Sequence, residues 1–318
     1  MSADYPRRVR RLLVLLGFFL LGCPVQDDDD STDPTDPGAP FVPCTSWALA
    51  SSLGVVEDIG LNEISGVVVS RRNPGFLWVH EDSGDDAVLT ALDRTGATHA
   101  TLVLDGVDAV DHEDLALGSC GDGSGETCLV VGDFGDNGAV RDSVTLWRLP
   151  EPDLSMTLPG TELEDTPEQL NYRYPEGAQD AEAIVLEPDG SPIVMTKRTD
   201  GDSRVYRLPA GGWDATADAE LVASITMGTD GGLLDAVTAA DLSSDGERLL
   251  VRTYTYARHY DLSGGGFDGI VEAPTRQMLP ALEQQGEAIA WDDDERGVLT
   301  IGEQENAIVW HMECSSPQ

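Results

Sequence analysis

The feature that most restricts the fold is an internal repeat of about 50 residues, which begins near Asn62. Each unit opens with a polar residue ahead of a short apolar strand, and two further apolar strands follow, separated by turn residues such as Asp189-Gly190. A repeat of this length, made of short strands, is typical of the blades of a β-propeller. The five units open at Glu63, Glu113, Glu182, Thr238 and Glu287.

The two ends of the repeat region complement each other. The fifth unit ends at His311 without a fourth strand, whereas residues 46–56 have the pattern of a strand that lacks a partner in the first unit. In a closed propeller, the N-terminal strand completes the last blade. The sequence therefore predicts an all-β fold, a single propeller of five four-stranded blades over residues 44–316, closed by this strand. The other outer strands are predicted at residues 98–104, 169–174, 220–227 and 270–279.

The N-terminus has the pattern of an export signal over residues 1–22. Four arginines between Arg7 and Arg11 precede the apolar residues 12–21, which are too few to span a bilayer. Residues 20–23 resemble the bacterial lipobox, and this resemblance implies that Cys23 is lipidated. An acidic tether follows over residues 23–43. We expect a protein of the bacterial cell envelope, on its periplasmic or outer side, that contacts the membrane only through its lipid. An ordinary signal peptide with an unmodified Cys23 is the alternative.

Four cysteines remain in the exported domain, where disulfides persist. Cys44 and Cys314 lie at its two ends, so a bond between them would join the two sides of the propeller seam. Cys120 and Cys128 flank a short glycine-rich loop and would form a local bridge across a hairpin. Four free thiols are the alternative.

The composition excludes several classes of protein. The chain has 19 Lys and Arg against 58 Asp and Glu, and 19 − 58 = −39, so it lacks a basic surface for nucleic acid or anionic lipid. Its one lysine, Lys197, follows no glycine-rich segment and precedes Arg198, which excludes a phosphate-binding loop. The His-Glu pairs at His80 and His112 lack the second histidine of a zinc protease helix.

One face of the predicted propeller is acidic. Antiparallel pairing brings the start of the first strand and the end of the second strand of each blade to the same face. Carboxylates that meet there repel one another unless they are protonated, paired or bound to a cation, and an all-oxygen cluster suits Ca²⁺ better than zinc. We therefore predict a Ca²⁺ site at the central channel; a water-filled channel is the alternative. The expected metal ligands are Glu63, Glu113, Glu182 and Glu287, and the expected ligand-binding residues are Asp82, Asp133, Asp136, Lys197, Arg198, Tyr254 and Glu303.

Short motifs between residues 60 and 200 resemble those of exported bacterial propellers of the SdiA-regulated and phytase-like (esterase-like) groups. The matching runs are Glu-Ile-Ser-Gly at Glu63, Asp-His-Glu-Asp-Leu at Asp111, Asp-Phe-Gly-Asp-Asn at Asp133 and Asp-Ala-Glu-Ala-Ile at Asp180. The resemblance implies Ca²⁺ near the axis and six blades. Because the repeat itself gives five, the sequence leaves five and six blades open.

Two functions fit these features. The first is a monomeric recognition module of the cell envelope that holds Ca²⁺ together with a small-molecule ligand or an envelope protein. The alternative is a Ca²⁺-dependent hydrolase of a phosphoester or lactone, with His80 or His112 as general base and with Lys197 and Arg198 steadying an anion. Adjacent strand residues point to opposite sides, so we expect His112 to point away from the channel that Glu113 faces. This alternation favours binding over hydrolysis.

Overall fold

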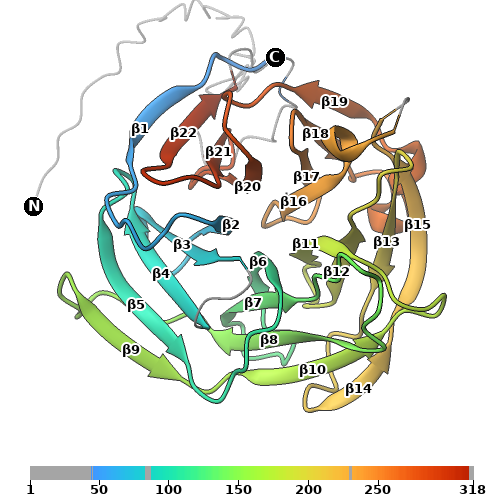
Figure 1. The fold of residues 1–318 in the computed structure, drawn as a ribbon, viewed down its shortest axis with the longest axis horizontal. Coiled ribbons are helices and arrows are strands. Elements are labelled where there is room, and N and C mark those ends of the chain that lie inside the picture. The colour runs from blue at the N-terminus through green and yellow to red at the C-terminus, as the bar shows by residue number, and fades with distance from the viewer. Residues whose placement is uncertain (1–43, 45, 83–86, 229–230, 315–318) are drawn as a thin grey trace, which may run out of the picture. The chain divides into compact units, whose positions relative to one another are not determined.

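Short aliphatic strands, separated by turns rich in Gly, Asp and Ser, fold into five sheets arranged around a common axis (Figure 1). The computed structural model describes residues 44, 46–82, 87–228 and 231–314. The predicted signal peptide, Cys23 and the tether lie outside the described residues. The fold is therefore the predicted five-bladed propeller, and the count of six that the family resemblance implied is wrong.

Each blade has four antiparallel strands. From the axis outward they are β2 (Ile64–Val69), β3 (Phe76–Glu81), β4 (Val88–Asp93) and β5 (Thr98–Leu104) in blade 1; β6 (His112–Ser119), β7 (Thr127–Asp133), β8 (Val144–Pro150) and β10 (Glu168–Arg173) in blade 2; β11 (Ala181–Leu186), β12 (Pro192–Thr196), β13 (Asp202–Arg207) and β15 (Glu220–Thr226) in blade 3; β16 (Val237–Leu242), β17 (Arg248–Thr253), β18 (Ala257–Asp261) and β19 (Thr275–Met278) in blade 4; and β20 (Gly286–Trp291), β21 (Gly297–Gly302), β22 (Ile308–Glu313) and β1 (Ser51–Val55) in blade 5.

The N-terminal strand closes the ring as predicted. β1 pairs antiparallel with β22, with Ser51 opposite His311 and Val55 opposite Ile308. A single bridge between Trp47 and Cys314 continues this pairing towards the chain ends. Every inner strand therefore has a neighbouring blade on both sides.

Both predicted disulfides are present. Cys44 is bonded to Cys314, and their Cα atoms are 5.5 Å apart. Cys120 is bonded to Cys128, with a Cα separation of 4.9 Å. The first bond joins the two sides of the seam, and the second closes a hairpin within blade 2.

Two strands extend blades 1 and 2 beyond the predicted four. β9 (Thr161–Asp165) pairs in parallel with β5, and β14 (Ala215–Asp218) pairs in parallel with β10. In the sequence, each of these strands comes between the third and fourth strands of the following blade. The chain therefore returns to pair with the outer edge of the preceding blade before it completes its own blade. These strands are short and polar, and for that reason the apolar pattern did not predict them.

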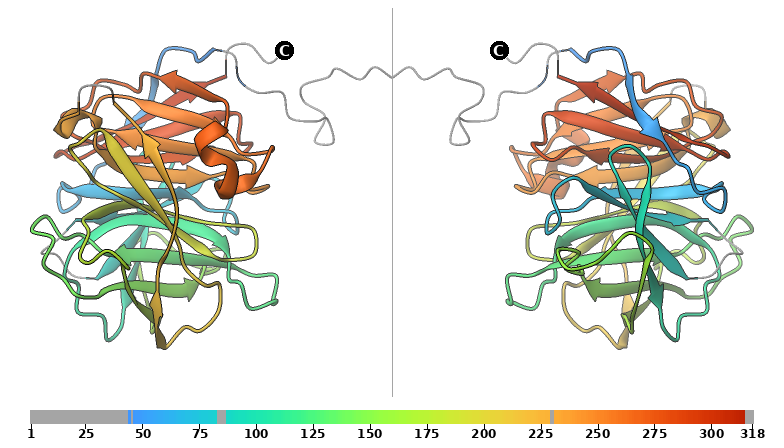
Figure 2. Two further views of the ribbon diagram at one scale, coloured as in Figure 1. Left: turned by 90° about the vertical axis from the view of Figure 1, so that its right-hand side faces the viewer. Right: turned by 90° about the vertical axis from the view of Figure 1, so that its left-hand side faces the viewer.

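The outer strand of blade 4 differs from the prediction over residues 270–279. Its first residues belong to a 3-10 helix, η2 (Gly266–Glu272), which buries Phe267 and Ile270 and lies on the outside of the ring against β15 (Figure 2). A second 3-10 helix, η1 (Leu233–Asp235), precedes blade 4. Among the described residues, no helix is long and apolar enough to cross a membrane.

Apolar side chains fill the space between neighbouring blades. Trp78 and Leu89 of blade 1 pack with Leu115 and Leu129 of blade 2 in one buried cluster. Because both faces of an inner strand are covered, these strands are apolar along most of their length rather than alternating. The core is thus a series of layers between blades, and the axis is left for polar groups.

Two carboxylates, the buried Asp114 and the half-buried Asp241, join inner strands near the axis. Asp114 Oδ2 accepts hydrogen bonds from the backbone N–H groups of Ile184 (2.9 Å) and Ala240 (3.3 Å), which links blades 2, 3 and 4. Asp241 Oδ2 accepts one from the N–H of Trp291 (2.7 Å), which links blades 4 and 5. Burial raises the pKa of Asp241 to about 7. These two carboxylates therefore link neighbouring blades, a role that was not predicted from the sequence.

We predict that the seam disulfide stabilises the fold more than the local one. It joins residues 270 apart, against 8 for the hairpin bridge, and cross-linking a longer loop removes more entropy from the unfolded chain. Changing Cys44 and Cys314 together to Ser should lower the free energy of unfolding by about 4 kcal/mol. The Cys120→Ser/Cys128→Ser pair is the control and should cost less. Urea titration measures both, and an equal or larger loss from the hairpin pair contradicts the prediction.

Candidate cation site

A β-bulge occurs near the start of every inner strand. At each bulge one residue of the inner strand has no residue opposite it on the second strand. A bulge re-aims the side chain of the extra residue, and bulges are common beside functional sites. The five bulge residues are Ser65, Glu113, Glu182, Thr238 and Glu287. Three of the four predicted metal ligands therefore occupy equivalent positions at one end of the inner strands.

The fourth, Glu63, does not occupy this position. Glu63 is exposed and lies two residues ahead of the bulge residue Ser65, in register with Asp111 and Asp180 of the next two blades. The expected alignment of the first unit on its first acid, Glu63, is wrong by two residues. The Ser65 hydroxyl donates to the backbone carbonyl of Glu113 instead, so in blade 1 the bulge contributes a link to the neighbouring strand.

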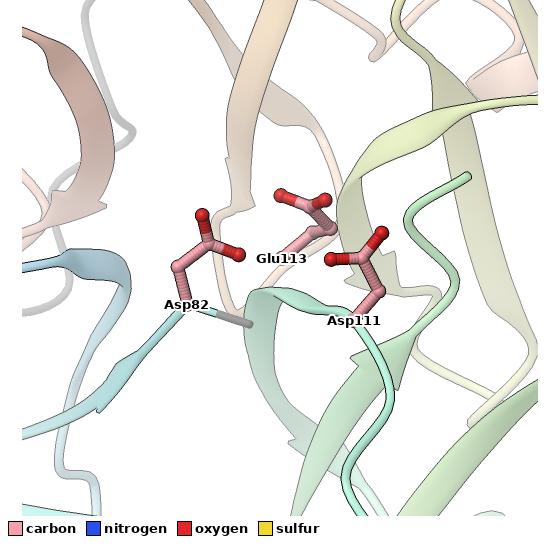
Figure 3. Close-up of side chains that lie close together, drawn as sticks. All are labelled: Asp82, Asp111 and Glu113. Atoms are coloured by element: carbon pink, nitrogen blue, oxygen red, sulfur yellow. The ribbon is translucent and has the colours of Figure 1, made fainter. Parts of the chain in front are cut away.

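Acidic side chains gather at this end of the axis in two groups that share Glu113. The first contains Asp82, Asp111 and Glu113, whose carboxylates point towards one another (Figure 3). The second contains Glu113, Asp180 and Glu182. Within each group, one oxygen from each residue lies within 4.8 Å of the others. Asp111 and Asp180 were not predicted as ligands, although the Asp-x-Glu spacing that blades 2 and 3 share marks both.

The Glu113 carboxylate lies at the centre of this arrangement. Residue Glu113 as a whole is 4% exposed, and no described residue donates a hydrogen bond to its carboxylate. Burial, and next the carboxylate of Glu182, raises the pKa of Glu113 well above the usual value. A Cβ atom on Gly135 would lie 2.1 Å from Glu113 Oε1 and 2.5 Å from Asp111 Oδ2, so glycine is needed for the loop to approach the two acids. Glu113 is thus a buried acidic residue whose carboxylate has no hydrogen-bond donor among the described residues.

Lys197 lies beside the second group. Its ammonium pairs with Glu182 Oε1, and it lies 5.5 Å from the centroid of the Tyr254 ring. Burial works against the charge of Lys197, but the carboxylate of Glu182 outweighs it and raises the lysine pKa. The structure shows Lys197 in an ion pair with Glu182. Arg198 pairs with Asp200.

The remaining predicted rim residues have separate roles. Asp133 accepts hydrogen bonds from Arg141 Nη2 (2.9 Å) and from the backbone N–H of Asp111 (3.2 Å). Asp136 accepts one from the backbone N–H of Arg141 (2.7 Å). Both therefore hold the loop that carries Gly135 over the acids. This support explains why neither belongs to the two acidic groups.

Glu287 and Glu303 extend the acidic face into blade 5. The side-chain amide of Gln285 bridges them, donating to Glu287 Oε1 (3.2 Å) and to Glu303. Glu287 Oε2 is buried and has no hydrogen-bond partner in the described part of the chain. Burial, and next the carboxylate of Glu287, raises the pKa of Glu303 to about 7.

The two candidate bases, His80 and His112, contact each other at the junction of blades 1 and 2. Their ring centroids are 6.1 Å apart and the rings are nearly perpendicular. His80 Nδ1 lies 2.7 Å from the carbonyl oxygen of Glu81, which assigns the proton to Nδ1. Burial lowers the pKa of His80 to about 3 and also lowers the pKa of His112. Both rings are therefore neutral near pH 7.

Comparison with known proteins finds a structural similarity and no family. No family model and no curated protein matches the chain. Among solved structures, the chain is similar to the PQQ-bound form of aldose sugar dehydrogenase from Streptomyces coelicolor, with 10% identity and a TM-score of 0.48. The match covers 86% of this chain and 99% of that one. The resemblance to SdiA-regulated and phytase-like propellers stays a prediction.

We predict that, without divalent cations, the protein loses stability as the pH rises from about 5 to 8. Glu303 and Asp241 have folded-state pKa values of about 7, above those of the unfolded chain. Such groups contribute stability that is fully present below the unfolded pKa and is lost as the pH rises through the folded pKa. The melting temperature in EDTA should therefore be higher at pH 5 than at pH 8. Glu303→Gln should flatten this slope, and a melting temperature that rises with pH contradicts the assignment.

Proposed function

We propose that this protein is a Ca²⁺-binding propeller of the bacterial cell envelope that recognises a ligand or partner protein at its acidic face. The observation that carries the proposal is Glu113, a residue that is 4% exposed and whose carboxylate accepts no hydrogen bond from a described residue. A buried carboxylate in this state is costly unless a cation or a proton compensates it. Asp82 and Asp111 are close enough to share a cation with Glu113.

The donor set supports Ca²⁺ over transition metals. Both acidic groups consist of carboxylates, with no Cys or His among their members. Hard oxygen donors suit Ca²⁺, which accepts six to eight of them in flexible geometry, whereas zinc prefers nitrogen and sulfur ligands. Asp82, Asp111 and Glu113 would hold the ion, and the ion would supply positive charge to which an anionic group of a ligand can bind.

A depression beside the second group is the proposed recognition surface. Its volume is about 460 Å³, and its lining includes Asp136, Asp180, Lys197, Arg198 and Leu233. It therefore combines charges of both signs with an exposed aliphatic side chain. Asp180 belongs both to this lining and to the acidic group, so the depression adjoins the proposed ion.

The position of the histidines supports binding rather than hydrolysis. A general base must reach the water that attacks the substrate. The rings of His80 and His112 are buried against each other between blades, 1% and 4% exposed. The proposal therefore assigns no catalytic residue.

Ca²⁺ should stabilise the protein. At a hundred times its dissociation constant, an ion that binds only the folded state adds about 2.7 kcal/mol. We expect the melting temperature to rise on adding Ca²⁺ after EDTA treatment, and Glu113→Gln to abolish most of the rise because Glu113 belongs to both acidic groups. Differential scanning calorimetry measures both.

The matched control is Glu164→Gln, which removes the same charge from an exposed position in the outer strand β9. Its response to Ca²⁺ should equal that of the unmodified protein. A melting temperature that does not change with Ca²⁺ would contradict the proposed site. An equal loss of the Ca²⁺-induced rise in the two variants would also contradict it.

The anchor is tested separately. The two disulfides are typical of a protein outside the cytoplasm, and we propose that a lipid on Cys23 holds it in the envelope. Cys23→Ser should move the protein from the membrane fraction to the soluble fraction of lysed cells. Metabolic labelling with a palmitate analogue should mark the unmodified protein alone. Unchanged fractionation of the variant contradicts the anchor.

A further inference from the structure

The second acidic group already has a cation in contact with it. The ammonium of Lys197 pairs with Glu182, whose side chain is 1% exposed, while the side chain of Lys197 is 14% exposed. The backbone N–H of Lys197 donates to the carbonyl oxygen of Asp180 (2.9 Å), so the main chain of the lysine is fixed beside another member of the group. Both the side chain and the main chain of Lys197 are therefore held against the second group.

Glu113 of the first group pairs with no such cation among the described residues. Glu113 belongs to both groups, but its carboxylate has no ion pair or hydrogen bond among the described residues, although it is nine-tenths buried. The two groups are therefore alike in their donors and differ in their counter-charge. Glu182 of the second group is compensated by the ammonium of Lys197, whereas Glu113, which both groups share, pairs with no described cation.

We propose that Lys197 acts as a built-in substitute for a cation at the second group, so that the face binds one divalent ion instead of two. This inference rests on the proposed Ca²⁺ site. A Ca²⁺ ion at Glu113, Asp180 and Glu182 needs oxygens of Glu182, and the ammonium occupies Glu182 Oε1. A divalent ion at the same place would also repel the ammonium strongly in a poorly hydrated site.

The choice of residue fits this role. Lys197 is the one lysine of a chain whose other basic residues, apart from histidine, are all arginine. An ammonium is a compact point charge on a flexible stem, whereas a guanidinium is a planar fork. Of the basic side chains, lysine is therefore the one that resembles a small metal ion in size and charge distribution.

The test is the number of Ca²⁺ ions bound per chain. Equilibrium dialysis of the detergent-solubilised full-length protein, with atomic absorption of the dialysed samples, should give one ion for the unmodified protein. Lys197→Met removes the ammonium and should give two. Arg207→Met removes the same charge from another residue of blade 3, which pairs with Glu187 and Asp268, and should still give one.

A double variant assigns the added ion. Lys197→Met combined with Glu182→Gln should bind one ion, because the second group then lacks both the ammonium and a carboxylate. Two ions in this double variant would place the extra ion elsewhere and overturn the inference.

The remaining outcomes separate the inference from the function on which it rests. Two ions in the unmodified protein, or one in Lys197→Met, overturn the inference and leave the Ca²⁺ site intact. No ion in any variant overturns both. Ca²⁺ at the second group supplies the charge that Lys197→Met removes, so circular dichroism should show that this variant is folded in Ca²⁺. A variant that stays unfolded in Ca²⁺ contradicts the inference.

Discussion

Closure of the ring by β1 and β22 is the constraint on which the other features depend. Once the fifth blade receives its outer strand from the N-terminus, all five inner strands are held around one axis, and residues that are far apart in sequence meet there. The bulges then bring equivalent residues of each blade to the same end of that axis. The acidic face is therefore a product of repetition and closure together, because neither an open array nor a single blade would bring the carboxylates together.

The acidic residues near the axis differ in whether backbone N–H groups donate hydrogen bonds to their carboxylates. Asp114 and Asp241 accept backbone N–H groups from neighbouring inner strands and hold the blades together. Glu113 receives no such donor from the described part of the chain, although it is as buried as Asp114. Burial alone thus does not separate a structural acid from a candidate metal ligand. The distinction lies in the donors, because a satisfied carboxylate gains little from a cation, whereas an unsatisfied one gains a great deal.

Much of the fold could be predicted from the sequence, and less of the site. The period of the repeat and the unmatched strand at each end determine the blade count and the closure, and cysteines at the two ends fit the same seam. The position of Glu63 failed because the bulge residue of blade 1 is Ser65, which is not acidic, so the acid two residues earlier was aligned in its place. Asp114 could not be recognised, because its donors Ile184 and Ala240 are 70 and 126 residues away.

The extra parallel strands bear on how one molecule meets another. β9 covers the outer edge of blade 1 and presents Glu162, Glu164 and Asp165 as exposed residues, so its own free edge is acidic. Unpaired strand edges are templates for adding strands from other chains, and charged residues on an edge oppose this. Two copies that approach through β9 bring like charges together. Because β9 pairs with β5, the outer edge of blade 1 is the acidic strand β9 instead of the less charged strand β5. This edge opposes aggregation.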